Sequence, residues 1–310
     1  MKNHSHARRK SGFTLIELMV SMGITAVIIT VLVTLTSVAT DTWTRSRSEL
    51  RASRQAKVLI DTMAKDFEAL VSRRGGKSEW LFAEIDPDSD LPQVLRGGNG
   101  NSNVAGLTFF TAATDRYNGQ IGEAADAGGD VSCVSYRMRF QDPIEGVSGT
   151  DDTNTFIVYR LLVNPDQTFE DLLGEESLDD AFSSYENEVV EEQNFICENV
   201  HLITVTFLVE VTRSGTGGNA GVTETARVTL DSSTSNGKFR LSGAGIETDF
   251  DADGFTAEEI SSGRLTGVEL SVSVLSDAGM IRRNAADGLT EKDYSRQSFH
   301  YSRVVDVPGV

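Results

Sequence analysis

An acidic stretch of the chain has the residue types of a calcium-binding loop and part of its spacing. Residues 249–260 read DFDADGFTAEEI, with Asp249, Asp251 and Asp253 at alternate positions and Gly254 directly after them. An EF-hand loop places oxygen ligands at its first, third and fifth positions, a glycine at the sixth and a bidentate glutamate at the twelfth. The start of this stretch therefore matches a calcium loop.

The rest of the stretch fits calcium only in part. The twelfth position is Ile260, while Glu258 and Glu259 come one or two residues too early. Calcium takes about six to eight oxygen ligands, of which these carboxylates and the carbonyl of Phe255 would supply several. The pattern predicts either a calcium site or an acidic turn without metal.

The two cysteines are a second candidate for covalent chemistry. Cys133 and Cys197 each lie in or beside a predicted strand. In an oxidising compartment they can form one disulfide, which would stabilise the fold by roughly 4 kcal/mol in the chain-entropy model. Two buried free thiols on separate strands are the alternative, and the sequence does not separate the two.

Motifs of known enzyme classes are not found. Residues 75–78 read GGKS and resemble the end of a phosphate-binding loop, but Val71 stands where the first glycine of that motif belongs. The sequence has neither G-x-S-x-G nor H-E-x-x-H. His201 falls within a predicted strand, where a structural role is the simpler interpretation. We therefore predict that the protein is not an enzyme.

Charge is divided unevenly along the chain. Residues 1–77 carry a net charge of +7 (13 Lys and Arg against 6 Asp and Glu), and residues 78–310 carry −25 (15 against 40). The basic part surrounds an apolar segment, whereas the acidic part resembles a solvated domain. Nucleic-acid phosphates would repel this acidic part, so we expect no nucleic-acid partner.

An apolar segment holds a single carboxylate. Residues 13–40 contain one charged residue, Glu17, and follow the basic residues 1–12. About 20 apolar residues span a bilayer, so we expect one transmembrane helix with its N-terminus in the cytoplasm. A carboxylate within lipid costs roughly 2.5–3.5 kcal/mol, so Glu17 is expected to have a function. A plain signal anchor is the alternative, but it gives no reason for Glu17 or for Gly12 before Phe13.

The run KSGFTLIELMV around this carboxylate resembles the prepilin signature of type IV pilins, type II secretion pseudopilins and their relatives. The resemblance implies that a prepilin peptidase cuts after Gly12 and methylates the new N-terminal residue, Phe13. It also implies that Glu17, fifth in the mature chain, neutralises the N-terminal amine of a neighbouring subunit during assembly. Pairing two buried charges removes the cost of leaving either one alone in lipid.

A helical pattern continues beyond the apolar segment. Residues 41–72 contain no Pro or Gly, and their apolar residues recur mostly at steps of three and four. This spacing predicts an amphipathic helix that packs on a domain core and ends at Gly75 and Gly76. We therefore expect one helix over 13–72, in which 41–76 is the segment that enters the outer domain.

Two further resemblances concern the subtype. The stretch SRQAKVLIDTMAKDFEAL, with Asp61 and Asp66, is similar to the second half of the helix in J-class minor pseudopilins. The long interior insertions and the ending HYSRVVDVPGV also resemble prepilin-like proteins of the Verru_Chthon gene cassette. The sequence does not separate these two subtypes.

Beyond residue 77 the pattern changes to strands rich in Val, Ile, Thr and Phe. The predicted strands are 104–111, 131–140, 155–163, 200–211, 222–230 and 265–275. The second and third are expected to be antiparallel neighbours, and the fourth is expected to be central in its sheet. We predict an α+β fold in which the long N-terminal helix packs on antiparallel β-sheet, as in pilins, with a globular domain over 77–310.

Two segments are expected to be insertions between strands. Residues 84–103 are rich in turn residues and predict a loop. Residues 164–195 are strongly acidic and predict solvated surface, with a short helix over 171–182. A surface that binds a cation or a basic partner is the alternative for this second segment.

These features favour a minor pilin or pseudopilin subunit of a type II secretion or type IV pilus-like filament. We expect a single-pass inner-membrane protein whose C-terminal domain lies in the periplasm or on an extracellular filament. The expected partners are prepilin peptidase and other pilin or pseudopilin subunits. A pilin-like adhesin or substrate-binding subunit anchored in the membrane is the alternative, and a membrane-anchored exo-enzyme has no supporting motif.

Overall fold

The chain forms two compact units, Met1–Glu49 and Leu50–Val310. The computed structural model describes residues 14–85, 105–112, 130–143, 153–213, 221–230, 237–252, 254–284 and 296–308. Helix α1 (Leu15–Glu68) begins in the first unit and ends in the second. All of the described strands belong to the second unit.

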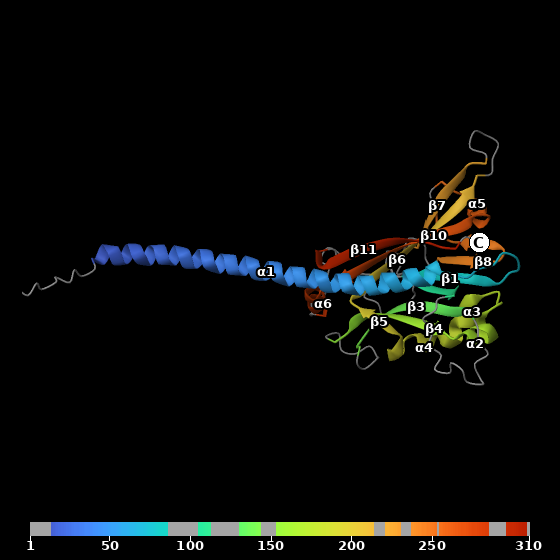
Figure 1. Ribbon diagram of the computed structural model, residues 1–310, viewed down its shortest axis with the longest axis horizontal. Coiled ribbons are helices and arrows are strands. Elements are labelled where there is room, and N and C mark those ends of the chain that lie inside the picture. Colours follow the sequence, from blue (N-terminus) through green and yellow to red (C-terminus); the bar gives the residue numbers. More distant parts are fainter. Residues whose placement is uncertain are drawn as a thin grey trace, which may run out of the picture. The chain divides into compact units, whose positions relative to one another are not determined.

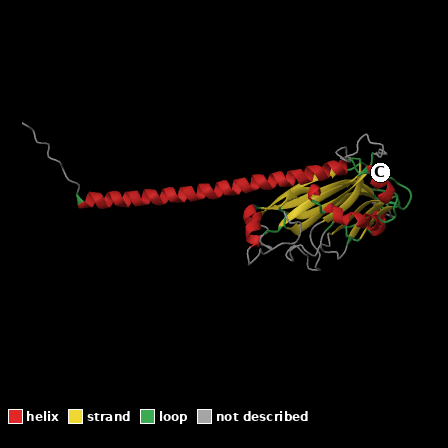
Figure 2. Ribbon diagram, turned by 90° about the horizontal axis from the view of Figure 1, so that it is seen from below, coloured by secondary structure: helices red, strands yellow, loops and turns green. Residues whose placement is uncertain are grey.

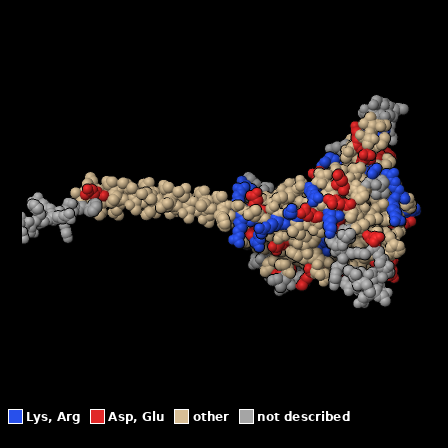
Figure 3. Space-filling model, in the orientation of Figure 1, with Lys and Arg blue, Asp and Glu red and all other residues tan. Residues whose placement is uncertain are grey.

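The described part of the first unit is the apolar half of α1. Every residue from Thr14 to Arg47 is exposed within the chain, and no charged residue stands between Glu17 and Asp41. An 18-residue window of this helix has a mean hydropathy of 2.4, and Figure 3 shows its uncharged surface. By length and composition, α1 is the one helix among the described residues that can cross a membrane.

Polar side chains within this apolar stretch are satisfied by the helix itself. A series of threonine hydroxyls donates to the carbonyl four residues earlier, over 2.8–2.9 Å: Thr25, Thr30, Thr34, Thr36 and Thr40. A hydroxyl that bonds its own backbone leaves no unpaired donor in lipid. The helix therefore tolerates these threonines in a bilayer, which agrees with a membrane anchor.

Two antiparallel sheets make up most of the second unit. The strands are β1 (Glu79–Ile85), β2 (Ala105–Thr111), β3 (Ser132–Gln141), β4 (Thr155–Val163), β5 (Phe195–Glu198), β6 (Val200–Thr212), β7 (Thr223–Thr229), β8 (Lys238–Ser242), β9 (Gly245–Thr248), β10 (Arg264–Leu275) and β11 (Ser298–Asp306). One sheet has the order β5-β4-β3-β2-β1-β8-β9, and the other has the order β11-β10-β6-β7. The predicted α+β fold, with a long helix packed on antiparallel sheet, is thus confirmed, and the strands divide into two sheets.

The remaining helices are short. They are α2 (Pro165–Gln167), the π-helix η2 (Thr168–Leu172), α3 (Leu178–Phe182), the 3₁₀-helix η3 (Ser183–Tyr185), α4 (Glu186–Val189), the 3₁₀-helix η4 (Glu192–Asn194), α5 (Ala257–Ser261) and α6 (Asp277–Asn284). The helices between residues 165 and 194 cover the seven-stranded sheet and form a second apolar cluster with it. They contribute Leu172, Leu178, Phe182, Tyr185 and Val189 to this cluster. The interpretation of 164–195 as solvated surface was therefore wrong for this segment's inner side, because apolar residues recur among its acids.

The main core joins the end of α1 to both sheets. Buried residues of α1, among them Leu59, Met63 and Phe67, share one cluster with the inner faces of the two sheets. The Phe67 ring stacks on Phe109 of β2, with centroids 4.3 Å apart. Figures 1 and 2 show the strands of the second unit lying along this part of α1. The later residues of the predicted amphipathic stripe are thus the central packing element of the unit, whereas two earlier ones, Leu50 and Val58, are exposed.

A buried carboxylate attaches α1 to the seven-stranded sheet. Asp66 is fully buried and accepts two hydrogen bonds of 2.8 Å from Arg160 of β4, one from Nε and one from Nη2. The Tyr136 hydroxyl of β3 donates to the same carboxylate. Burial raises the pKa of Tyr136, so this hydroxyl stays protonated and keeps donating. Charge and hydrogen bonds together compensate the cost of burying Asp66.

Helix α1 ends earlier than the sequence predicts. The expected end lay near residue 72, followed by Gly75 and Gly76, but the helix ends at Glu68. Leu70 instead forms a β-bridge with Thr111, and the amide of Val71 donates to the Phe110 carbonyl over 2.9 Å. The chain therefore leaves the helix because the C-terminal end of β2 offers these backbone bonds.

All six predicted strands are present, as β2, β3, β4, β6, β7 and β10, with boundaries that agree within one residue. The antiparallel pairing of β3 with β4 and the central place of β6 between β10 and β7 are confirmed. Five strands were missed, namely β1, β5, β8, β9 and β11. Of these, β5, β8 and β9 are only four or five residues long, too short for an alternating pattern to stand out. The predicted loop over 84–103 lies outside the described residues except for its first two positions, which end β1.

Replacing Asp66 is expected to destabilise the second unit strongly. The Asp66→Ala variant leaves Arg160 without its carboxylate in the core, and such a loss costs about 3–5 kcal/mol. As a control, Asp61→Ala breaks an exposed pair with Arg303 and should cost about 0–1 kcal/mol. Chemical denaturation of the full chain in detergent, followed by fluorescence of the buried Trp80, measures both changes. Equal losses in the two variants would contradict the role given to Asp66.

Candidate functional site at the start of the apolar helix

The first turn of α1 is closed by a reciprocal pair of hydrogen bonds. The Glu17 carboxylate accepts from the backbone amide and from the hydroxyl of Thr14, each over 2.9 Å. In return, the Glu17 amide donates to the Thr14 hydroxyl over 3.3 Å. This is a capping box, in which two otherwise unpaired amides at a helix start are satisfied. Glu17 is therefore held at the very beginning of the apolar helix.

The position of Glu17 suits the pairing of charges in an apolar environment. A carboxylate in the first turn is stabilised by the positive end of the helix dipole. Its oxygens remain exposed within this single chain, so an ammonium group from outside can reach them. The predicted cleavage and methylation positions, Gly12 and Phe13, lie outside the described residues.

Comparison with family models identifies this segment. Residues 7–33 match the prokaryotic N-terminal methylation motif, which is found in type IV prepilin-like proteins. The match includes Gly12, Phe13 and Glu17 and the first half of the apolar helix. Comparison with curated proteins and with solved structures gives no match. The resemblance to prepilins stated from the sequence is thus confirmed, while the J-class and Verru_Chthon subtypes stay predictions.

The motif carries two consequences for the chain. It implies processing by a prepilin peptidase and assembly with other pilins. The apolar helix that follows it fits the membrane anchor of a prepilin-like protein. The chain therefore combines a processing signal, an anchor and a folded second unit.

The acidic residues that suggested a J-class subtype have different roles. Asp66 is the buried partner of Arg160 described above. Asp61 is half exposed and lies 2.9 Å from Nη1 of Arg303, which also contacts Glu68. Both carboxylates therefore fasten α1 to strands of the second unit, Asp66 to β4 and Asp61 to β11.

Two of the predicted calcium ligands, Asp249 and Glu259, make other contacts. Glu259 forms a capping box with Thr256 at the start of α5, and Asp249 accepts from the Lys238 amide over 3.1 Å. An arginine cation already lies against the loop, because Nη1 of Arg213 donates to the Gly254 carbonyl over 2.8 Å.

Calcium binding is not settled by these contacts. No cluster of three potential ligands forms among the described His, Cys, Asp and Glu residues. Asp251 and Glu258 are exposed, Phe255 is half-buried, and Asp253 lies outside the described residues. Calcium binding at this loop stays a prediction.

The two cysteines are free thiols, so the disulfide considered from the sequence is not formed. Cys133 lies on β3 and belongs to the second apolar cluster, whereas Cys197 lies on β5 and belongs to the main core. Strand β4 separates the two strands, and the side chains lie on opposite faces of the sheet. Burial raises the pKa of both thiols, that of Cys197 to about 12, so neither is a reactive thiolate at neutral pH.

His201 is a structural residue of β6, as the sequence suggested. It is buried, its ring lies 6.1 Å from Phe156, and Nε2 lies 3.2 Å from the Ser298 hydroxyl. Burial lowers the pKa of His201 to about 4, so the imidazole is neutral at pH 7.

Two functional features were missed from the sequence. Thr14 as the helix cap could have been found, because T-x-x-E before an apolar run is the capping-box signature. The Asp66–Arg160 pair could not have been found, because its partners are 94 residues apart and no local pattern joins them.

The free thiols are expected to be unreactive in the folded protein and reactive after unfolding. In the native full chain, iodoacetamide at pH 8 should modify neither Cys133 nor Cys197, because both are fully buried. In denaturant without reductant, it should modify both. Peptide mass spectrometry counts the modified sites. Recovery of a disulfide-linked peptide containing both cysteines would show that the assignment of free thiols is wrong.

Stability is expected to fall with acid in a way that depends on His201. Its pKa is about 4 in the folded chain and 6.5 in the unfolded chain, so below pH 6.5 only the unfolded chain takes up this proton. The loss of unfolding free energy should grow as the pH falls towards 4, reach about 3 kcal/mol and then level off. Urea denaturation at several pH values should show a smaller acid dependence for His201→Gln than for the wild type. The exposed His300→Gln control should keep the wild-type dependence.

Proposed function

We propose that the protein is a structural minor pilin or pseudopilin subunit of a type II secretion or type IV pilus-like filament. The observation that carries the proposal is the methylation motif at residues 7–33, which runs directly into an uncovered apolar helix. The same helix ends as the central element of a folded domain. A subunit built in this way can pack its apolar half against other subunits while the second unit stays outside the apolar layer.

The proposed processing follows from the motif. Prepilin peptidase cuts between Gly12 and Phe13 and methylates the new N-terminus, and the chain keeps residues 13–310. The basic residues 1–12 stay in the cytoplasm before cleavage, because positive flanks are retained on that side. The second unit then faces the periplasm or the outside of a filament.

The proposed assembly step depends on Glu17. In the filament, the Phe13 amine of a neighbouring subunit reaches this carboxylate and replaces Thr14 as its main partner. An unpaired carboxylate in lipid is costly, so the pair favours one register between subunits. Other pilin or pseudopilin subunits are therefore the proposed partners. The role is structural, without an enzymatic activity or a nucleic-acid ligand.

Two substitutions separate capping from assembly. Glu17→Gln removes the charge, whereas Thr14→Ala breaks the capping box and keeps the carboxylate. We expect both variants to be inserted in the membrane and processed, but only Glu17→Gln to be lost from assemblies with other prepilin-like subunits. Crosslinking in cells followed by blotting of the subunit ladder measures this. If both variants assemble like the wild type, Glu17 has no pairing role and a plain anchor becomes the better account.

A further inference from the structure

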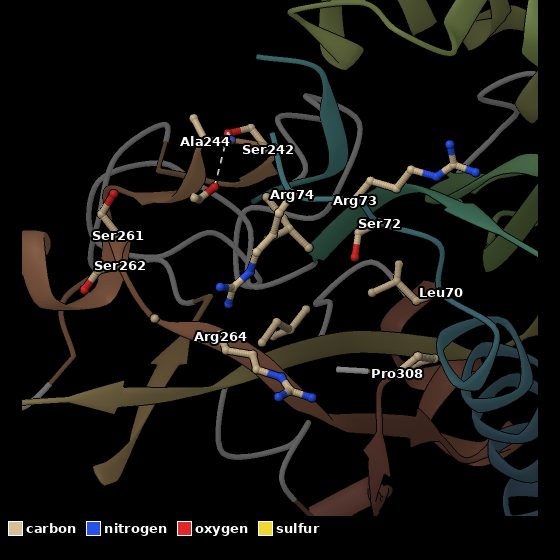
Figure 4. Close-up of a pocket in the computed structure, with 15 residues that line it drawn as sticks. Leu70, Ser72, Arg73, Arg74, Ser242, Ala244, Ser261, Ser262, Arg264 and Pro308 are labelled. Carbon is tan, nitrogen blue, oxygen red and sulfur yellow. Dashed lines mark hydrogen bonds between the residues drawn. The ribbon is translucent and has the colours of Figure 1, made fainter. Parts of the chain in front are cut away.

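A pocket of about 140 Å³ lies where α1 gives way to the sheet. Three segments meet there: the loop after α1 at Ser72–Arg74, the β8–β9 turn at Ser242–Gly245 and the α5–β10 junction at Ser261–Leu265. Figure 4 shows these segments around a common space. All of them belong to the second unit. None of them is part of the processing and assembly segment described above.

The walls of the pocket are set by backbone contacts. The amide of Gly75 donates to the Gly243 carbonyl over 2.8 Å, and the Gly243 amide donates to the Ser78 carbonyl over 3.0 Å. A Cβ added at Gly243 would lie 2.3 Å from the Gly75 carbonyl oxygen, and one at Gly245 would lie 2.3 Å from that of Ser261. Side chains at these positions would push the segments apart. The pocket is therefore built by the fold rather than by loose surface loops.

The side chains around the pocket are cationic and hydroxylic. Arg74 and Arg264 line it from two different segments, together with serines such as Ser72 and Ser261. In Figure 4, Arg74 extends from its loop toward the strand that begins with Arg264, whereas Arg73 points away. The Ser72 hydroxyl is buried and has no hydrogen-bond partner among the described residues. This hydroxyl is thus an unpaired donor among the residues that line the pocket.

Neither arginine is neutralised within the described part of the chain. Within the described residues, seven other arginines pair with carboxylates, and they are Arg51, Arg137, Arg160, Arg213, Arg227, Arg240 and Arg303. Arg74 and Arg264 have no such partner among the described residues, although the chain holds 46 acids against 28 basic residues. Guanidinium groups bind carboxylate and phosphate through two parallel hydrogen bonds. The pairing of Arg74 and Arg264 with an external anion is therefore chemically favoured.

A simpler role for Arg74 would be to offset the negative end of the α1 dipole. The residue after β2 already takes part in that role, because the Ala112 amide donates to the Ala69 carbonyl over 2.8 Å. The Thr111 hydroxyl likewise donates to the Asp66 carbonyl over 2.9 Å. Arg264 comes from another element, so the dipole of α1 does not explain its position.

We propose that this pocket binds an oxyanion, a carboxylate or phosphate group, between Arg74 and Arg264. Pockets for drug-sized ligands enclose about 300–1,000 Å³, so a space of 140 Å³ suits one charged group rather than a whole cofactor. The group is carried either by a free small anion or by an acidic side chain of a partner protein. The proposal does not depend on the function proposed above, because it concerns the second unit alone.

Calorimetric titration of the full chain in detergent tests the proposal. The probes are inorganic phosphate and the peptide acetyl-Ala-Glu-Ala-amide, each at constant ionic strength set with chloride. The matched peptide acetyl-Ala-Gln-Ala-amide, which lacks the carboxylate, should not bind. Saturable binding of phosphate alone would identify a free anion as the ligand, and tighter binding of the glutamate peptide would identify a protein side chain. Each probe is titrated into the millimolar range, up to a 50-fold excess over the protein. If neither probe binds under these conditions, the proposal is overturned.

Variants connect the binding to the pocket. The double variant Arg74→Gln with Arg264→Gln should lower the affinity for the bound probe at least tenfold. Arg54→Gln on α1 with Arg282→Gln on α6 removes the same charge from residues that do not line the pocket, and should lower the affinity less than twofold. The double variant Arg74→Lys with Arg264→Lys keeps the charge but loses the paired hydrogen bonds, and should lower the affinity about three- to tenfold. Equal weakening by the two glutamine pairs would show a bulk-charge effect and contradict the pocket.

Discussion

The buried ion pair between Asp66 and Arg160 is the constraint on which the second unit depends. A fully buried carboxylate is tolerated only where its charge and hydrogen bonds are satisfied, and here Arg160 and Tyr136 supply both. A shift of the helix by one turn, about 5.4 Å, would leave the carboxylate without these partners. The pair therefore fixes the register of α1 on the seven-stranded sheet. The apolar stripe of the helix supplies the packing area, and the ion pair selects one arrangement of it.

The general plan could be predicted from the sequence because its signals are local. The charge-free run, the stripe at three- and four-residue steps and the longer β-rich segments each produce a pattern within a dozen or so residues. The division into two sheets could not be predicted, because it depends on which distant strands pair, as β1 does with β8. The early end of α1 has the same origin, since the C-terminal end of β2 bonds the residues that would continue the helix.

The candidate site was predictable to a similar degree. Glu17 and the Gly12–Phe13 bond stand out because the prepilin signature is contiguous, and the methylation motif matches the segment that contains them. The cysteines were harder, because pairing depends on which face of a sheet each thiol occupies, and that follows from strand register. Arg74 and Arg264 are 190 positions apart in the chain and carry no motif, so only the folded backbone brings them to one pocket.

The central claim is that this chain is a processed prepilin-like subunit whose mature N-terminus is Phe13. Intact and N-terminal peptide mass spectrometry of membrane-extracted protein, from cells with and without prepilin peptidase, tests it most directly. The account predicts a chain that begins with methylated Phe13 when the peptidase is present and that retains residues 1–12 when it is absent. A chain that still carries residues 1–12 in peptidase-competent cells would contradict the account and leave residues 13–40 as a simple membrane anchor.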